Sequence, residues 1–153
     1  MIYQPVNLSP KNISIDAKHP YIFTWKSTGA PQTDYQVIIR NNDDDSMAYN
    51  SYKIQSHTSS HTVPKNTLQN GVSYKWQVQV WNNLDSTVSD WVFLSANTTP
   101  VLTFIAPDFS TPVYINSQDF VFKVNYTQEE GISVKKFRFI LYDEIGANII
   151  SIS

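Results

Sequence analysis

The chain has 153 residues, a mass of 17.5 kDa and a formal net charge of −2 at pH 7. Its Lys and Arg residues form no basic stripe, so no field in the sequence would drive binding to a nucleic acid backbone. The absence of Cys excludes a disulfide, a thiol nucleophile and a thiolate metal site, while 14% aromatic residues favour a packed β protein over a disordered chain.

The first ten residues have no basic n-region and no apolar h-region, and no run approaches the roughly 18 apolar residues of a membrane span. If Met1 is the native start, we expect a chain made in a cytoplasm and exported, if at all, without a cleaved signal. We also expect no membrane insertion.

Short strands follow one another from the N-terminus. Residues Tyr3–Ser9 predict an edge strand, because Pro5 cannot donate a hydrogen bond to a ladder. Alternating apolar residues predict strands over Tyr21–Trp25 and Tyr35–Arg40, and the segment Ser27–Thr33 between them, rich in Gly, Pro and Ser, reads as a loop.

A run of three aspartates, Asp43–Asp45, follows the third strand. Calcium is one interpretation, but calcium loops place ligands at alternate positions and include a glycine, and both features are missing here. A solvated hairpin turn, which Asn and Asp favour, is the other interpretation, and we adopt it.

Two histidines, His57 and His61, lie four residues apart, His57 between the predicted strands Met47–Lys53 and Ser59–Val63 and His61 within the second of them. On a helix this spacing could hold a zinc ion, but the surrounding residues favour a strand and provide no third ligand. We therefore expect two exposed polar histidines.

The segment Leu68–Trp81 is the strongest pattern in the chain. From Tyr74 onward it alternates apolar and polar residues, which predicts a half-buried central strand. The spacing of Leu68, Gly71 and Tyr74 is typical of a tyrosine corner, in which the ring packs inward and the hydroxyl bonds to nearby backbone. After a turn, Ser89–Phe93 opens the last of about seven strands, the number that such a sandwich needs. The residues predicted to form its core are Phe23, Trp25, Tyr35, Leu68, Tyr74, Trp76 and Trp91.

Through these positions residues 1–99 resemble a fibronectin type III domain of the bacterial and bacteriophage type. The resemblance implies an all-β fold, an antiparallel immunoglobulin-like β-sandwich. It implies little about function, because one fold serves many functions.

Residues 100–153 repeat part of this pattern. The segment Phe120–Val124 echoes Tyr21–Trp25, and Phe137–Leu141 echoes Tyr35–Ile39, at an offset of about 100 residues that is typical of tandem domains. We predict a hairpin turn over residues 143–147 and a strand over 148–152 after them. The second domain is thus expected to be the N-terminal part of another sandwich of the same kind.

A half-sandwich would expose the inner side chains of Phe120, Phe122, Phe137 and Phe139. Burying one Phe stabilises a protein by roughly 1.5 to 3 kcal/mol, so four exposed rings forfeit on the order of 6 to 12 kcal/mol, comparable to the stability of a whole domain. We expect either a longer polypeptide or a neighbouring chain that donates the missing strands.

No phosphate loop, nucleophile elbow or metalloprotease helix is present in the sequence. The carboxylate pairs Glu129-Glu130 and Asp143-Glu144 fall in predicted turns, whereas a general acid needs burial to raise its pKa. We therefore predict no enzyme activity, no catalytic residue, no cofactor and no bound metal.

The alternation of the strands places Ile38, Arg40, Gln79 and Trp81 on the outer face of the sheet, where the third and sixth strands are neighbours in a fibronectin-type fold. One interpretation is an interaction surface for protein or sugar, since Trp and Arg dominate interface hot spots. The other is that the Trp81 ring stacks under Arg40 or folds over the edge of the sheet.

The second domain is similar to repeats in structural proteins of phages that infect Gram-positive bacteria, through N-Y-T-Q-E-E-G, K-K-F-R-F-I-L-Y-D-E and G-A-N-I-I. This resemblance implies a non-catalytic tail, baseplate or neck fibre component located in the virion. Its partners would be copies of itself, other virion proteins and, through later domains, a host surface glycan. The alternative is an accessory or carbohydrate-binding module of a cell-surface or secreted bacterial glycoside hydrolase.

Overall fold

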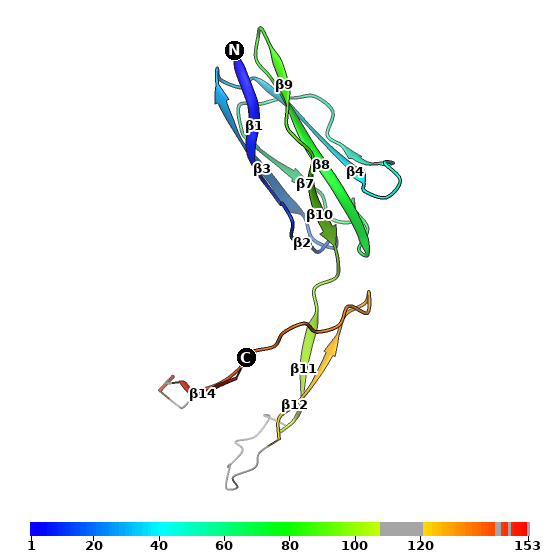
Figure 1. Cartoon of the computed structure of the whole chain (residues 1–153), viewed down its shortest axis with the longest axis vertical. Coiled ribbons are helices and arrows are strands. Elements are labelled where there is room, and N and C mark those ends of the chain that lie inside the picture. The colour runs from blue at the N-terminus through cyan, green and yellow to red at the C-terminus, as the bar shows by residue number, and fades with distance from the viewer. Residues whose placement is uncertain (108–120, 143–144, 147, 153) are drawn as a thin grey trace. The chain divides into compact units, whose positions relative to one another are not determined.

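The structure is a computed structural model (Figure 1) that describes residues 1–107, 121–142, 145–146 and 148–152. It divides into two compact units, Met1–Thr99 and Pro100–Ser153. Among the described residues, no helix has the length and apolar character needed to span a membrane. Every regular element that the structure describes is a strand.

The smaller sheet of the first unit contains β1 (Ile2–Ser9), β3 (Tyr21–Gly29) and β7 (Ser60–Val63), antiparallel and in the order β1-β3-β7. The edge position of β1 accommodates Pro5, as the sequence predicts. Strand β3 continues to Gly29, into the segment predicted as a loop, because β1 pairs with it from Thr24 to Gly29 and places Ile2 opposite Gly29.

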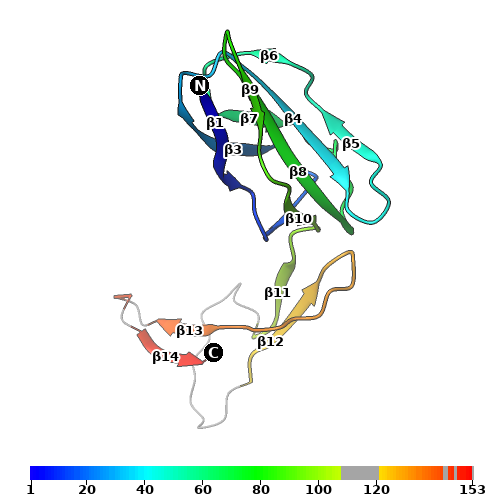
Figure 2. The same ribbon diagram turned by 45° about the horizontal axis from the view of Figure 1, so that its top comes forward.

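The larger sheet has the strand order β2-β10-β8-β4-β5, with β6 also paired to β4 and β9 to β8. These strands are β2 (Ser14–Ile15), β4 (Asp34–Asn41), β5 (Met47–Asn50), β6 (Ile54–Gln55), β8 (Val72–Trp81), β9 (Ser86–Val88) and β10 (Val92–Ala96). Figures 1 and 2 show the two sheets as layers, with β1 and β3 in one and β4 and β8 in the other. The predicted all-β, immunoglobulin-like sandwich is confirmed.

The period of two along β8 directs its apolar side chains into the space between the layers. Trp76 and Phe23, from opposite sheets, are both fully buried, and their ring centroids lie 4.8 Å apart in an edge-to-face arrangement. A large side chain buried in this way stabilises the fold by roughly 1.5 to 3 kcal/mol. Trp25, Tyr35, Leu68 and Tyr74, all predicted for the core, are each less than 10% exposed.

The turn before β8 forms a tyrosine corner. The Tyr74 hydroxyl accepts a hydrogen bond from the Gln69 amide at 2.8 Å and donates one to the Gln69 carbonyl at 3.4 Å. Gly71 has a φ of +84°, a conformation that favours glycine, and its amide donates to the Ala96 carbonyl. The corner therefore holds the start of β8 against the end of β10.

A buried glutamine joins the two layers at the other end of the sandwich. Gln32 is 4% exposed, and its Oε1 accepts hydrogen bonds from Trp25 Nε1 at 2.9 Å and from the Ser27 hydroxyl at 2.8 Å. Its Nε2 donates to the carbonyls of Ser56 and Thr58. The buried N–H group of the Trp25 indole thus has a hydrogen-bond acceptor, as buried polar groups require.

Among its described residues, the second unit contains two antiparallel strand pairs, β11 (Val101–Ala106) with β12 (Lys123–Thr127) and β13 (Phe139–Tyr142) with β14 (Asn148–Ile152). Strand β12 begins at Lys123, within the predicted strand Phe120–Val124. The rings of Phe122 and Phe139 lie 4.5 Å apart.

Several residues of the second-unit predictions fall outside the described part of the chain. They are Phe120, Asp143, Glu144 and Ala147. The pairing of β11 with β12 was not foreseen from the sequence. That this unit is part of a second sandwich stays a prediction.

Candidate functional site

The predicted surface lies on the outer face of β4 and β8, where both strands present their polar residues. The register pairs Ile38 with Gln77 and Gln36 with Gln79, so Ile38 and Gln79 are diagonal neighbours. Arg40 pairs with Lys75, six residues along β8 from Trp81, which is about 20 Å at the usual rise of a strand. The four predicted residues share one face but do not form one cluster.

The cation that covers Trp81 is a lysine. Lys53 Nζ lies 4.8 Å from the centroid of the partly exposed Trp81 ring and 3.8 Å from Asp34 Oδ1. Asp34 is the residue that pairs with Trp81 across the strands. The interpretation that Arg40 stacks on Trp81 is therefore wrong. The strand register places the two residues far apart, and Lys53 lies over the Trp81 ring.

Arg40 instead belongs to an ionic cluster at the other end of the two strands. Arg40 Nη1 lies 3.3 Å from Asp45 Oδ2, and Lys75 Nζ lies 2.8 Å from Asp45 Oδ1. The hydrogen bond from Lys75, with the charge of Arg40 nearby, holds the pKa of Asp45 below its usual value. The neighbouring Asp44 accepts from the amide and hydroxyl of Ser46, which also lowers its pKa. These carboxylates close a turn, as expected.

Trp91 differs from the prediction that it belongs to the core. Its side chain is partly exposed, and Lys75 Nζ lies 5.5 Å from the centroid of its ring. Trp91 precedes β10 and shares the outward parity of Phe93, while Val92 and Leu94 point inward. The ring packs on the outer surface, beneath a cation, instead of between the layers.

His61 also differs from its prediction, since it is not an exposed polar residue. It pairs with Phe23 and points between the layers, where Nδ1 lies 3.1 Å from the Tyr35 hydroxyl and Nε2 lies 2.7 Å from the Tyr49 hydroxyl. Partial burial lowers the pKa of His61 and raises those of both tyrosines. His57 is exposed, as predicted, and its Nδ1 lies 2.6 Å from the Gln32 carbonyl.

Within the described residues, no three His, Asp or Glu side chains are grouped closely enough to hold a metal ion. Asp44 and Asp45 lie in an exposed turn, and Asp34 and Asp45 are paired with cations.

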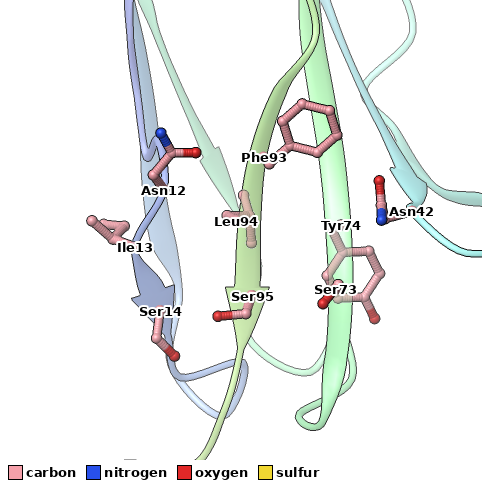
Figure 3. A pocket seen from close by; sticks show the side chains of 9 residues that line it. All are labelled: Asn12, Ile13, Ser14, Asn42, Ser73, Tyr74, Phe93, Leu94 and Ser95. Carbon is pink, nitrogen blue, oxygen red and sulfur yellow. The ribbon is translucent and has the colours of Figure 1, made fainter.

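A hollow of about 350 Å³ lies over β2, β10 and β8 (Figure 3). The half-exposed ring of Phe93 lies between the side chains of Asn12 and Asn42, and Ser73 lies below. No pattern in the sequence marks Asn12, Asn42, Ser73 and Phe93 as a group. Phe93 could have been found from the alternation of Val92–Ala96, but Asn12 and Asn42 belong to different turns, and only the fold brings them together.

Comparisons with known proteins bear on the first unit. A family model described as "Rha78A-like, N-terminal immunoglobulin domain" matches residues 5–100. No curated protein matches the chain. A solved structure described as "Myokine structure" is 13% identical, with a TM-score of 0.48, over 60% of this chain and 94% of that one.

Proposed function

The chain belongs to the family of Rha78A-like, N-terminal immunoglobulin domains, and from this membership we propose that it serves as a non-catalytic module of a larger protein. The observation that carries the proposal is the match itself, which spans residues 5–100 and so covers nearly all of the unit Met1–Thr99. An immunoglobulin-like sandwich fills its interior with side chains, and its function therefore lies on surfaces and loops.

The larger protein that we propose is a cell-surface or secreted bacterial glycoside hydrolase. The family description supports this choice, since Rha78A is a name of the glycoside hydrolase kind and the domain is an N-terminal one. In such a protein the module would hold a neighbouring domain in place. Its partner would then be the polypeptide to which it is joined.

The hydrogen bonds at the end of the first unit support such a mechanical role. The Thr99 amide donates to Asp16 Oδ2 at 2.9 Å, and Asp16 Oδ1 accepts from Asn70 Nδ2 at 2.9 Å. The chain is therefore fastened to the sandwich up to the residue where the unit ends. A fastened end transmits force from one domain to the next better than a flexible one.

A second candidate is a structural module of a phage virion, in a tail, baseplate or neck fibre. The observation that favours it is the apolar surface of β11, where Val101, Leu102, Phe104 and Ile105 are each more than half exposed. Exposed strands of this kind are covered in assemblies, and copies of the chain or other virion proteins would supply the cover.

One antibody against residues 1–99 distinguishes the two candidates. Cultures of the encoding organism, before and after prophage induction, are separated into cells, supernatant and particles banded by density. We expect the antibody to precipitate glycosidase activity from cells or supernatant, and antibody absorbed with the purified unit to precipitate none. Detection in the particle band without glycosidase activity would favour the virion module and overturn the first candidate.

A further inference from the structure

The hollow around Phe93 combines an exposed aromatic ring with unused polar groups. Phe93 is 50% exposed, whereas its neighbours Val92 and Leu94 are 8% and 4% exposed. A single exposed apolar residue is common on protein surfaces and needs no explanation by itself. Phe93 differs from such a residue because polar side chains surround its ring in the hollow.

Two amides flank the ring in Figure 3, those of Asn12 and Asn42, and both residues line the same hollow. Within the part of the chain that the structure describes, the side chains of Asn12, Asn42 and Ser73 form none of its hydrogen bonds. The nearby Asn41 and Asn70 differ, because their amides bond to backbone or to Asp16. The amides at the hollow therefore keep their donors and acceptors available for a ligand.

These residues are also held in position by their backbones. The Asn12 amide nitrogen donates to the Phe93 carbonyl at 2.7 Å, and the Asn42 amide nitrogen donates to the Ser73 carbonyl at 2.9 Å. Each turn is thus fastened to the sheet at the hollow. A site whose backbone is already ordered loses less entropy when a ligand binds.

No charged residue that the structure describes lines this hollow, so it favours an uncharged ligand over an ionic one. None of its lining residues carries a charge at pH 7, and the hydroxyl of the one titratable residue, Tyr74, is engaged in the tyrosine corner. Lys75, which pairs with Phe93 across the strands, is bonded to Asp45. No cation is positioned to select a phosphate, sulfate or carboxylate.

A sugar ring matches this combination, since it has a C–H face that packs on an aromatic ring and a rim of hydroxyl groups that both donate and accept hydrogen bonds. An amide side chain offers a donor and an acceptor side by side, which suits two adjacent hydroxyls. A volume of about 350 Å³ lies within the range of small-ligand sites.

We propose that Phe93, Asn12, Asn42 and Ser73 form a binding site for a neutral oligosaccharide. A second hollow, along β1 and β10, shares Asn12 and Phe93 with the first, but the charged residues Lys11 and Asp90 line it, so the proposed neutral site is confined to the first hollow. The proposal rests on the geometry of the sandwich and holds for either larger protein considered above.

The test uses the full chain, labelled with a fluorophore, on an array of neutral and acidic oligosaccharides, followed by solution titration of the strongest binder. We expect binding to at least one neutral oligosaccharide. Phe93→Ala should weaken it at least tenfold, and Asn12→Ala combined with Asn42→Ala should weaken it similarly. Tyr52→Ala is the matched control, since Tyr52 is a 73% exposed aromatic residue outside both hollows, and it should leave the affinity unchanged.

Thermal unfolding of each variant shows whether it keeps the fold, which we expect because the substituted side chains are exposed. Several outcomes would overturn the proposal: no binding to any neutral glycan, binding to acidic glycans alone, or binding that Phe93→Ala leaves intact. Loss of binding in Tyr52→Ala alone would place the site elsewhere and overturn it as well.

Discussion

Tyr74 fixes the turn that starts the longest strand of the sandwich, through hydrogen bonds between its hydroxyl and the backbone of Gln69. Replacing Tyr74 by Phe keeps the ring in the core and removes these bonds. We expect Tyr74→Phe to lower the free energy of unfolding by about 1 to 1.5 kcal/mol, the net value of a typical hydrogen bond. Urea unfolding followed by tryptophan fluorescence measures the change.

The exposed Tyr52 provides the control for this substitution, since its side chain is 73% exposed. Tyr52→Phe should change the free energy of unfolding by less than about 0.5 kcal/mol, as surface substitutions usually do. Equal effects of the two variants would show that the corner hydrogen bonds contribute nothing to stability.

His61 should make the stability of the first unit depend on pH. Its pKa is lowered in the folded state by partial burial between Tyr35 and Tyr49, so the unfolded chain binds a proton more readily. The stability that His61 provides is then complete above its unfolded pKa of about 6.5 and is lost as the pH falls through its lower folded pKa. Urea midpoints measured between pH 8 and pH 5 should decrease accordingly.

A variant without the titrating ring tests this assignment. His61→Gln should lower stability at pH 8 and should flatten the decrease between pH 8 and pH 5. His57→Gln, which changes an exposed histidine, should retain the decrease of the unaltered chain. The assignment fails if His61→Gln and the unaltered chain show the same pH dependence.

The predictions for His61 and Trp91 were wrong for different reasons: His61 has buried partners from other strands, whereas Trp91 lies on the outer side of the sheet, where its alternation with Val92 places it. Parity along a strand tells which side of a sheet a residue faces, but the environment on that side depends on strands distant in sequence. His61 meets Tyr35 from β4 and Tyr49 from β5, and Trp91 meets Lys75 from β8. None of these partners can be identified from local spacing.

At the scale of the elements, the first unit's strands of four or more residues could be predicted, and those of two or three residues could not. Strand β8 carries its own signal, because ten residues alternate without interruption. Strands β2 and β6 have two residues each, and their pairing with β10 and β4 exists only once those strands are in place. The hollow at Phe93 is lined in part by β2 and the turn before it, so it could not be predicted before the pairing of β2 was known.

The connection that ends the first unit depends on Asp16, which follows β2. Its carboxylate accepts hydrogen bonds from the Asn70 side chain and from the amides of Thr99 and Lys18, and these bonds hold its pKa well below the usual range. Stability from Asp16 is therefore present above its unfolded pKa, about 4, and is lost as the pH falls toward the folded value.

We expect Asp16→Ala to lower the free energy of unfolding by about 1 to 2 kcal/mol at pH 7, since hydrogen bonds to a charged group are lost from a partly exposed site. The difference should shrink below pH 4. Hydrogen exchange at the Thr99 amide should quicken in the variant at pH 7. Asp43→Ala is the control, because Asp43 lies in an exposed turn. An unchanged exchange rate at Thr99 in Asp16→Ala would contradict a role in fastening this end.

For the whole molecule, the decisive feature is that every residue of the buried core cluster lies between Ile2 and Ala96. The family match, residues 5–100, covers nearly the same stretch. A domain with its own hydrophobic core can fold alone, and the unit Met1–Thr99 meets this condition, since all the core residues that the structure describes lie within it.

We therefore expect a fragment of residues 1–99 to unfold in urea with the same midpoint and slope as the first transition of the full chain, within about 0.5 kcal/mol. A fragment of residues 1–90 is the control, because it removes β10 and with it Val92, Leu94 and Ala96 from the core, and it should not fold. If the 1–99 fragment were unfolded or much less stable than the full chain, residues beyond Thr99 would have to complete the sandwich, and the first unit would not be an independent module.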